Sequence, residues 1–319
     1  MIIGNSISPL STIIYAAGGI SYIPLLDTYA NSKSCWSVFK MRTTFTGSFG
    51  TMRLDADDST ALLPYNLQGT PDLDALTLFA NGGLVTLKIW NGQDLAETPL
   101  AQSVTGSQPS LTDGSGNPLL ENGILAPDFD GINDVMEVPS SQSTFRFMHD
   151  GDNSSTFTVA KFGNSLNPDQ AYVFLGNNAG SSDKTGVTLS YNDRASSSES
   201  NALNNVISNG AANACFNKNN DVVTPNTQQI ISVLMDADNS TLIDRSRVFV
   251  NDGSVIQSST SSATPSTSNA THNLQVGANG NGGNNLEGSI QEITIFEDNY
   301  LTEQSDIVTQ INSRFNTFV

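Results

Sequence analysis

Two short acidic runs have the residue types and spacing of calcium ligands. Asp150-Gly-Asp-Asn153 and Asp236-Ala-Asp-Asn239 place side-chain oxygens at alternate positions, as hard cations prefer. Neither run completes an EF-hand loop, because the Gly at the sixth position and the Glu at the twelfth are missing. Surface turns use the same residue types. The sequence therefore predicts no cofactor, with calcium at Asp236 and Asp238 as the one alternative.

Four aromatic side chains are candidates for stacking against a sugar ring. Trp90 ends an apolar strand, so we expect it in the core, and we expect Trp36 there as well. Tyr191 and Tyr300 remain, with Asp193 close to Tyr191 in the chain. These three residues, Tyr191, Asp193 and Tyr300, are the carbohydrate-binding candidates.

No motif for another reaction is present in the sequence. There is no Gly-x-Ser-x-Gly elbow, Walker loop or zinc motif. His149 and His272 stand alone, and no Cys-x-x-Cys pair offers metal-site spacing. Cys35 and Cys215 are the only thiols; they could form one disulfide, but we favour two buried thiols.

The charge balance limits the partners of this chain. Lys and Arg total 13 against 31 Asp and Glu, which gives a formal net charge of −18. Such a chain repels phosphate backbones and anionic membrane surfaces, so we expect no nucleic-acid partner. Only 14% of residues are charged, and Ser, Asn, Thr and Gly dominate the surface-like stretches. This composition is typical of exported or virion proteins.

The first 24 residues contain no charged side chain. A secretory signal would begin with Lys or Arg, and a membrane span would need about 20 apolar residues without Asn5, Pro9, Gly18 and Gly19. We therefore expect no membrane insertion. An anchoring arm that docks on partner proteins and an ordinary first strand both remain open. We divide the chain into an arm, residues 1–24, and one large sandwich domain, residues 25–319.

Two amphipathic segments predict short helices. Thr70 is a suitable N-cap, followed by Pro at the first helical position, and Gly82-Gly83 ends this helix. Near the C-terminus Thr302 is a suitable N-cap for a second helix. Its apolar face consists of Ile307, Ile311 and Phe315.

Most of the remaining pattern is that of strands. Trp36 to Leu54 alternates imperfectly around Thr46-Gly47, which predicts a hairpin. The Ser/Asn-rich runs Ala195–Asn205 and Ser258–Asn269 are expected as exposed loops, because they contain too little apolar surface for a core. Further strands are predicted at 84–90, 156–162, 171–175, 187–191, 229–235, 247–251 and 289–296.

The segment from Glu121 to Met136 combines turns and a short apolar strand. Asn122-Gly123 predicts a turn with positive φ, residues 124–129 a strand, and Asp130-Gly131 the next reversal. We interpret its carboxylates as turn-forming groups that carry no chemistry.

Segments spread over most of the chain resemble one family. Phe129-Asp-Gly-Ile-Asn-Asp134 is similar to the most recognisable signature of concanavalin-like, laminin-G-like sandwich proteins, which are common in bacteriophage and marine bacterial sequences. Leu25–Tyr29 and Lys40–Ser48 resemble the opening hairpin of that family, and Ser246–Asn251 and Glu287–Ile293 its closing strands. A more distant resemblance is to the sandwich domain of fungal arabinofuranosidases. The implied fold is all-β: a concanavalin-like (laminin-G-like) β-sandwich jelly roll with one or two short helices, including a C-terminal helix.

The arabinofuranosidase resemblance also implies where catalysis would lie. A retaining sugar hydrolase needs two carboxyl groups about 5 to 5.5 Å apart. In those relatives the nucleophile lies on the strand that aligns with Gly186–Leu189, and the acid lies in the loop before Glu287-Gly288. Neither segment of this chain carries a carboxylate. We therefore expect no enzymatic activity, with a glycoside hydrolase as the alternative.

These observations favour a bacteriophage virion structural protein. It would be exposed on the capsid or tail as a decoration, fibre or spike protein, bind host surface glycans or stabilise the shell, and lack catalysis. Its partners would be other virion proteins, bound through residues 1–24, and it would occur in many copies or as a homo-oligomer. A secreted glycoside hydrolase or carbohydrate-binding module of arabinofuranosidase type is the alternative, and an extracellular adhesion module is the third hypothesis.

Overall fold

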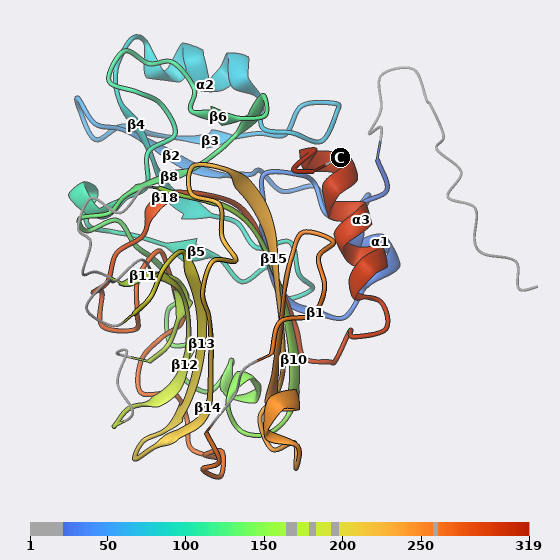
Figure 1. Cartoon of the computed structure of the whole chain (residues 1–319). Helices are drawn as coiled ribbons and strands as arrows, with labels where there is room; N and C mark the ends of the chain where they lie inside the picture. Colours follow the sequence, from blue (N-terminus) through green and yellow to red (C-terminus); the bar gives the residue numbers. More distant parts are fainter. Residues whose placement is uncertain (1–21, 164–170, 179–182, 193–197, 258–260, 319) are drawn as a thin grey trace, which may run out of the picture.

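The computed structural model describes residues 22–163, 171–178, 183–192, 198–257 and 261–318. Within them two antiparallel sheets pack face to face as a β-sandwich, as expected (Figure 1). The smaller, six-stranded sheet has the order β1 (Ser32–Ser37), β18 (Glu287–Phe296), β10 (Asn153–Phe162), β15 (Gln228–Asp236) and β16 (Ser246–Val250), with β8 (Asp128–Asp130) beside β18.

The larger sheet contains ten strands in the part of the chain that the structure describes. Its order is β14 (Asn213–Asn219), β13 (Ala202–Asn209), β12 (Thr185–Asn192), β11 (Ala171–Gly176), β17 (Gln275–Val276), β9 (Met136–Glu137), β5 (Leu100–Ala101), β4 (Val85–Trp90), β2 (Gly50–Leu54) and β3 (Thr60–Leu63). Strands β6 (Leu120–Glu121) and β7 (Ile124–Leu125) form a separate antiparallel hairpin, connected by a two-residue turn.

The core lies between the two sheets. Strand β12 alternates apolar and polar residues, so Val187, Leu189 and Tyr191 all point inward. The ring of Tyr191 stacks on Phe162 of the opposite sheet at a centroid distance of 5.1 Å. Trp36 and Trp90 are fully buried, as predicted from their positions in apolar strands.

Three α-helices occur among the described residues, one more than the sequence predicts. The extra one is a single turn, α1 (Leu25–Thr28), where the family resemblance suggests part of a hairpin. Helix α2 (Leu73–Ala80) ends at Asn81, which has a positive φ of 45°. None of these helices is long and apolar enough to cross a membrane.

Helix α3 (Gln304–Phe315) packs on the outer face of the smaller sheet (Figure 1). Ile307, Ile311 and Phe315 are fully buried, which confirms the predicted apolar face. At its end Arg314 reaches Glu292 of β18, with nitrogen–oxygen distances of 2.8 and 3.0 Å. Ser37 of β1 donates a further hydrogen bond of 2.7 Å to Glu292. Both charged side chains are completely buried.

Three local predictions are wrong. The residues from Trp36 to Leu54 form no hairpin, because β1 pairs with β18 while β2 pairs with β3 and β4 of the other sheet. The connection between them carries buried apolar side chains, and Phe39 and Met41 contact Phe315 and Arg314 of α3 on its way from one sheet to the other.

The helix caps also differ from the predicted ones. Asp72 caps α2 by accepting a 3.0 Å hydrogen bond from the Ala75 amide, because Thr70 is already bonded to Asn66. Helix α3 has Glu303 at its N-cap, and the Thr302 hydroxyl donates to the Glu303 carboxylate.

The third error concerns the predicted strand at residues 124–129. It is broken into β7 and β8 at Pro127, which has no amide hydrogen for the ladder. The flanking turns are confirmed: Asn122 and Gly123 have φ angles of 50° and 78° in the tight β6–β7 hairpin, and Gly131 has a φ of 75°.

The buried ion pair predicts a large effect of one substitution. Arg314→Met should lower the free energy of unfolding by about 3 to 5 kcal/mol, because it leaves the Glu292 carboxylate buried without its cation. Arg146→Met is the matched control, since Arg146 pairs with Asp150 at the surface with a side chain 48% exposed; its cost should be below about 1 kcal/mol. Urea unfolding measures both, and equal losses would contradict the assignment.

Candidate functional site

The predicted carbohydrate residues do not come together. Tyr191 is 1% exposed and stacks with Phe162 and Tyr172 between the sheets, so its ring offers no face to a sugar. The assignment of Tyr191 as a stacking platform is therefore wrong. Asp193 lies outside the described residues. Tyr300 is half-buried beside the rings of Tyr29 and Phe296, at centroid distances of 5.6 and 4.6 Å, and its role in sugar binding stays a prediction.

The predicted metal ligands lie in a turn. Asn239 donates a 2.7 Å hydrogen bond from its side chain to the Asp236 carboxylate, and its amide donates to the Asp236 carbonyl. Asp238 is exposed nearby. The two acidic runs are neighbours in space, because Asn153 pairs with Asp236. Even so, the described residues contain no group of three acidic, histidine or cysteine side chains that could hold a metal ion.

The prediction of two buried thiols without a disulfide is confirmed. Cys35 and Cys215 are both buried and unbridged, and they belong to different sheets. Burial raises the pKa of Cys35 well above its usual value, so this thiol is protonated at neutral pH.

A polar surface forms where the sequence offered no motif: the outer face of β11 to β14. Successive residues of a strand point to opposite faces, so Thr188, Ser190 and Asn192 of β12 point outward. Register places Ser190 opposite Asn204 of β13, and Asn204 opposite Lys218 of β14. We call this surface the polar face.

An aromatic ring lies in the next row of the polar face. Register aligns Thr188 of β12 with Val206 of β13 and Phe216 of β14. Phe216 is half-buried and lies outside the hydrophobic core cluster. Its position therefore combines solvent access with the polar neighbours that a sugar-binding aromatic requires.

Charged groups of the polar face are paired with one another. The Asn204 side-chain amide donates a 2.9 Å hydrogen bond to the Glu199 carboxylate, which is 4% exposed as a residue. Lys218 lies 3.7 Å from the same carboxylate. The Glu199 and Lys218 charges therefore offset each other.

Three oxygens of the polar face are buried without a partner among the described residues. They are Thr188 Oγ1, Asn192 Oδ1 and Asn204 Oδ1, on residues that are 6%, 1% and 5% exposed. A buried acceptor that lacks a donor costs roughly 1 to 3 kcal/mol. All three oxygens are shielded from solvent, so their cost falls on the stability of the fold.

Sequence reasoning missed β13 because Asn204 and Asn205 were counted into an exposed Ser/Asn-rich loop. Both residues are buried in β13, and Asn205 donates a 2.8 Å hydrogen bond to Ser246 of the opposite sheet. The available signal was the apolar set Leu203 and Ile207, which lies at the inward positions of this strand.

The carboxylates of the acidic turn after β8 accept hydrogen bonds from the backbone of the same turn. Asp130 Oδ1 accepts hydrogen bonds from the amides of Ile132 and Asn133, at 2.8 and 3.1 Å. Asp134 Oδ2 accepts a 3.0 Å hydrogen bond back from the Asp130 amide. Burial raises the pKa of Asp134 to about 7, and the nearby Asp130 adds to this rise. The geometry agrees with the interpretation of these carboxylates as turn-forming groups.

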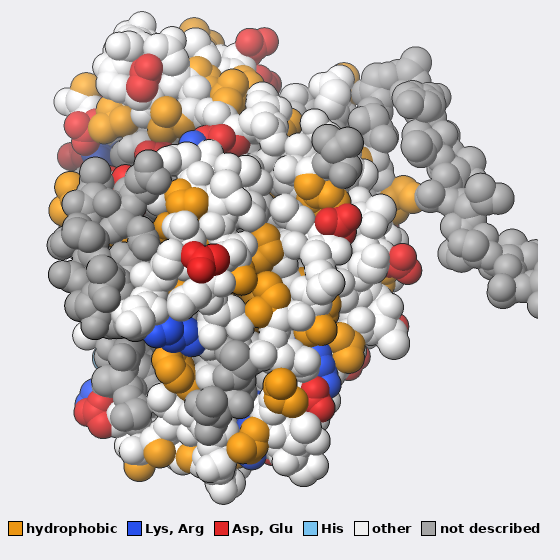
Figure 2. All heavy atoms as spheres, in the orientation of Figure 1, with side chains coloured by type: hydrophobic (Ala, Val, Ile, Leu, Met, Phe, Trp, Pro, Cys, Tyr) orange, Lys and Arg blue, Asp and Glu red, His pale blue; other side chains and the backbone are white. Residues whose placement is uncertain are grey.

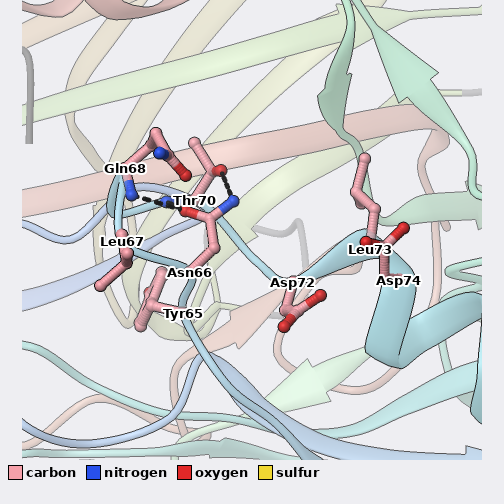
Figure 3. A pocket seen from close by; sticks show the side chains of 8 residues that line it. All are labelled: Tyr65, Asn66, Leu67, Gln68, Thr70, Asp72, Leu73 and Asp74. Atoms are coloured by element: carbon pink, nitrogen blue, oxygen red, sulfur yellow. Dashed lines mark hydrogen bonds between the residues drawn. The ribbon is translucent and has the colours of Figure 1, made fainter. Parts of the chain in front are cut away.

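Two surface hollows flank the loop from Tyr65 to Thr70. The first, of about 590 Å³, lies between this loop and the start of α2 (Figure 3). Its Asn66 amide is fully engaged within the loop, donating to Thr70 Oγ1 and accepting from the amides of Gln68 and Thr70. Asn66 therefore has no free hydrogen-bonding capacity for a ligand in this hollow.

Charged side chains are sparse on the molecular face drawn in Figure 2, where uncharged polar groups and scattered apolar side chains dominate. This agrees with the low charged fraction of 14%. A surface of this kind suits uncharged, hydrogen-bonding partners.

Comparisons with known proteins agree with the fold. No family model and no curated protein matches the chain. A GH54 α-L-arabinofuranosidase soaked with a cyclic sulfate inhibitor is similar with a TM-score of 0.64 at 12% identity, covering 93% of this chain and 65% of the enzyme chain. An arabinofuranosidase complexed with arabinofuranosyl-α-1,2-xylobiose gives 0.64 at 13% identity, with the same coverage.

A CBM40 of the Ruminococcus gnavus IT-sialidase gives a TM-score of 0.42 at 14% identity, covering 58% of this chain and 97% of that one. The chain spans about two thirds of the length of the arabinofuranosidase chains. At these identities the likeness shows the fold alone: a lectin-like β-sandwich.

The raised carboxyl pKa values predict a pH dependence of stability. Burial raises the pKa of Asp128 to about 6, against the lowering effect of Lys161, and that of Asp134 to about 7. The folded state therefore binds more protons than the unfolded state between about pH 4 and pH 7, and stability falls as the pH rises through this window.

Thermal unfolding at pH 5 and pH 8 tests this. The melting temperature should be several degrees lower at pH 8, and Asp134→Asn should reduce that difference. Asp152→Asn changes an exposed carboxylate and is the control. A difference that Asp134→Asn leaves unchanged would refute the role of Asp134.

Proposed function

We propose that this chain is a non-catalytic, glycan-binding sandwich protein on the surface of a bacteriophage virion. The observation that carries glycan binding is the half-buried ring of Phe216 on the outer face of the larger sheet, on the same face as Lys218 and Asn204. A ring with polar neighbours can stack against the apolar face of a sugar.

The ligand of this face is an uncharged glycan. Lys218, the cation on these rows, is paired with Glu199, and the chain carries a net charge of −18. An anionic glycan would meet repulsion from the net negative charge of the molecule. Host surface glycans rich in neutral sugars fit these conditions.

One pair of carboxylates on the larger sheet is too far apart for a retaining hydrolase. Glu137 of β9 lies on the row of Gln275, Gly176 and Thr188, and its carboxylate accepts hydrogen bonds from Asn273 and Gln275. Glu199 is bound to Asn204 on β13, four strands away from β9, or roughly 19 Å at the usual strand spacing. A retaining hydrolase needs about 5 to 5.5 Å.

A secreted glycoside hydrolase or carbohydrate-binding module remains the second candidate. The likeness of fold to arabinofuranosidases over 93% of the chain favours it. It differs from the main proposal in requiring turnover of arabinofuranosides for the hydrolase, or secretion without a virion for the module.

Attachment to the virion is assigned to the uncharged N-terminal segment, residues 1–24. Neighbouring virion proteins are its partners, and the sandwich is presented outward in many copies. The composition supports this placement, because Ser, Asn, Thr and Gly solvate the exposed loops with few charges. Calcium has no part in this proposal.

Glycan binding is testable with two variants of the polar face. Phe216→Ala should weaken binding to glycan-array hits about fivefold to tenfold through the lost ring contact. Thr188→Val should leave this binding unchanged and the melting temperature unchanged or higher, because it removes a hydroxyl that is unpaired and buried out of reach of a ligand.

Matched controls are Phe318→Ala, another half-buried ring, and Thr77→Val on the exposed side of α2. Binding that Phe216→Ala retains would exclude this site, and hydrolysis of an arabinofuranoside would favour the second candidate.

Deletion of residues 1–21 tests the attachment. Tyr22 is kept because its hydroxyl bonds to the carbonyls of Lys40 and Gly69 in the folded domain. Phage carrying the deletion should assemble virions that lack this protein, while the purified variant keeps its circular dichroism spectrum and glycan affinity. Normal incorporation of the shortened chain would refute the anchor.

A further inference from the structure

An amine, a side-chain amide and a carboxylate meet on strands β13 and β14. Register places Asn204 of β13 directly opposite Lys218 of β14, so their side chains leave the same face of the sheet. The β-carbons of such a cross-strand pair are about 4.5 to 5.5 Å apart. The pairing of two strands thus holds a lysine amine next to an asparagine amide.

Glu199, in the turn before β13, contacts both of these side chains with the same oxygen. Its Oε1 accepts a 2.9 Å hydrogen bond from Asn204 Nδ2 and lies 3.7 Å from Lys218 Nζ. The carboxylate therefore lies within reach of a proton on either nitrogen. We call Glu199, Asn204 and Lys218 the Lys–Asn–Glu cluster.

The Lys–Asn–Glu cluster is largely shielded from solvent. Glu199 and Asn204 are 4% and 5% exposed, and the side chain of Lys218 is 27% exposed. A site that excludes most of the water limits competition from water as a nucleophile. The amine of Lys218 is therefore the nucleophile nearest at hand for the amide carbon of Asn204.

Each member of the cluster has a distinct chemical capacity. A lysine amine is a nucleophile once a base removes its extra proton, and a carboxylate can serve as that base. The Cγ of an asparagine amide is an electrophilic carbon with a nitrogen leaving group. Reactants that a fold holds side by side react far faster than the same groups free in solution. The arrangement is that of an acyl transfer within the chain.

We propose that Lys218 and Asn204 form an intramolecular amide bond between β14 and β13, with Glu199 as the catalytic proton carrier. Glu199 accepts a proton from the Lys218 ammonium, and the freed lone pair of Nζ forms a bond to Asn204 Cγ. The Cγ–Nδ2 bond breaks, and Nδ2 takes the bonding electrons. Nζ loses two protons in all, and Glu199 passes both to Nδ2, which leaves as ammonium. The balance requires no oxidant, reductant or cofactor.

The bond would fasten the edge of the larger sheet. Strand β14 is the first strand of that sheet, and β13 is its one neighbour among the described strands (Figure 1). The turn between Asn209 and Asn213 joins the two strands at one end, and the pair of Asn204 and Lys218 lies toward the other. A covalent link there prevents the open end of the hairpin from separating. This inference goes beyond glycan binding and does not depend on it.

Mass spectrometry of the wild-type protein tests the bond. The intact mass should be lower than the sequence mass by one ammonia molecule. Arg194, Lys218 and Arg245 are successive trypsin sites, and trypsin does not cleave after an acylated lysine. Residues 195–245 should therefore remain in one peptide, without backbone fragment ions from cleavage between Asn204 and Lys218.

Two results of this measurement would overturn the proposal. One is the full sequence mass for this peptide region. The other is loss of ammonia together with normal cleavage after Lys218, which indicates a succinimide at an asparagine. The wild-type peptide decides the question even where a variant fails to fold.

Variants of the cluster identify the reacting groups. Lys218→Arg keeps the positive charge but removes the amine nucleophile, so it should retain the full mass. Glu199→Gln should slow the reaction by roughly 100-fold or more, because the proton carrier is lost, and protein purified soon after synthesis should be largely unlinked. Circular dichroism checks that both variants are folded.

The matched control is Lys33→Arg. Lys33 also pairs with a carboxylate, that of Glu297 at 3.3 Å, but the two side chains are 36% and 49% exposed. This variant should lose ammonia as the wild type does. Loss of ammonia that persists in Lys218→Arg would refute the role of that amine. These masses are measured without a glycan, so failure of the bond and failure of glycan binding are separate results.

Discussion

The buried ion pair between Arg314 and Glu292 holds together parts of the chain that are far apart in sequence. Removing two charges from water is costly, and the carboxylate is compensated by two nitrogen–oxygen contacts and the Ser37 hydroxyl. Arg314 Nε has no partner among the described residues. Burial raises the pKa of Glu292, and Arg314 and Ser37 oppose that rise. The C-terminal helix can leave its position on the sheet only by exposing or orphaning this pair.

Aromatic rings surround the same guanidinium. Its central carbon lies 5.9, 5.8 and 5.7 Å from the ring centroids of Tyr22, Phe39 and Phe315. Contacts of this kind stabilise a cation that is shielded from water. The start of the described chain, the connection between the sheets and the end of α3 therefore meet at one point.

The polar face contains the outward-pointing residues of β12, in which apolar and polar residues alternate. On β12 the inward residues supply Leu189 and Tyr191 to the core, and the outward ones supply Thr188 and Asn192 to the face. Packing between the sheets fixes the backbone, and the backbone in turn fixes the spacing of the outward oxygens at the strand and residue repeats of a sheet.

Local patterns in the sequence determined most of the elements. Apolar periodicity predicted strands such as β4, β10 and β18 and the buried face of α3, and Asn122-Gly123 predicted its hairpin, because these features depend on near neighbours in the chain. The site depended on tertiary structure. Tyr191 has the same residue type and strand pattern whether its face meets solvent or another sheet, and only the packing of Phe162 against it decided for the core. Asn204 looked like a loop residue in a polar run, and became part of a buried face when β12 and β14 paired on either side of it. Pairing partners and covered faces are set by contacts between distant segments, and the local sequence carries no record of those contacts.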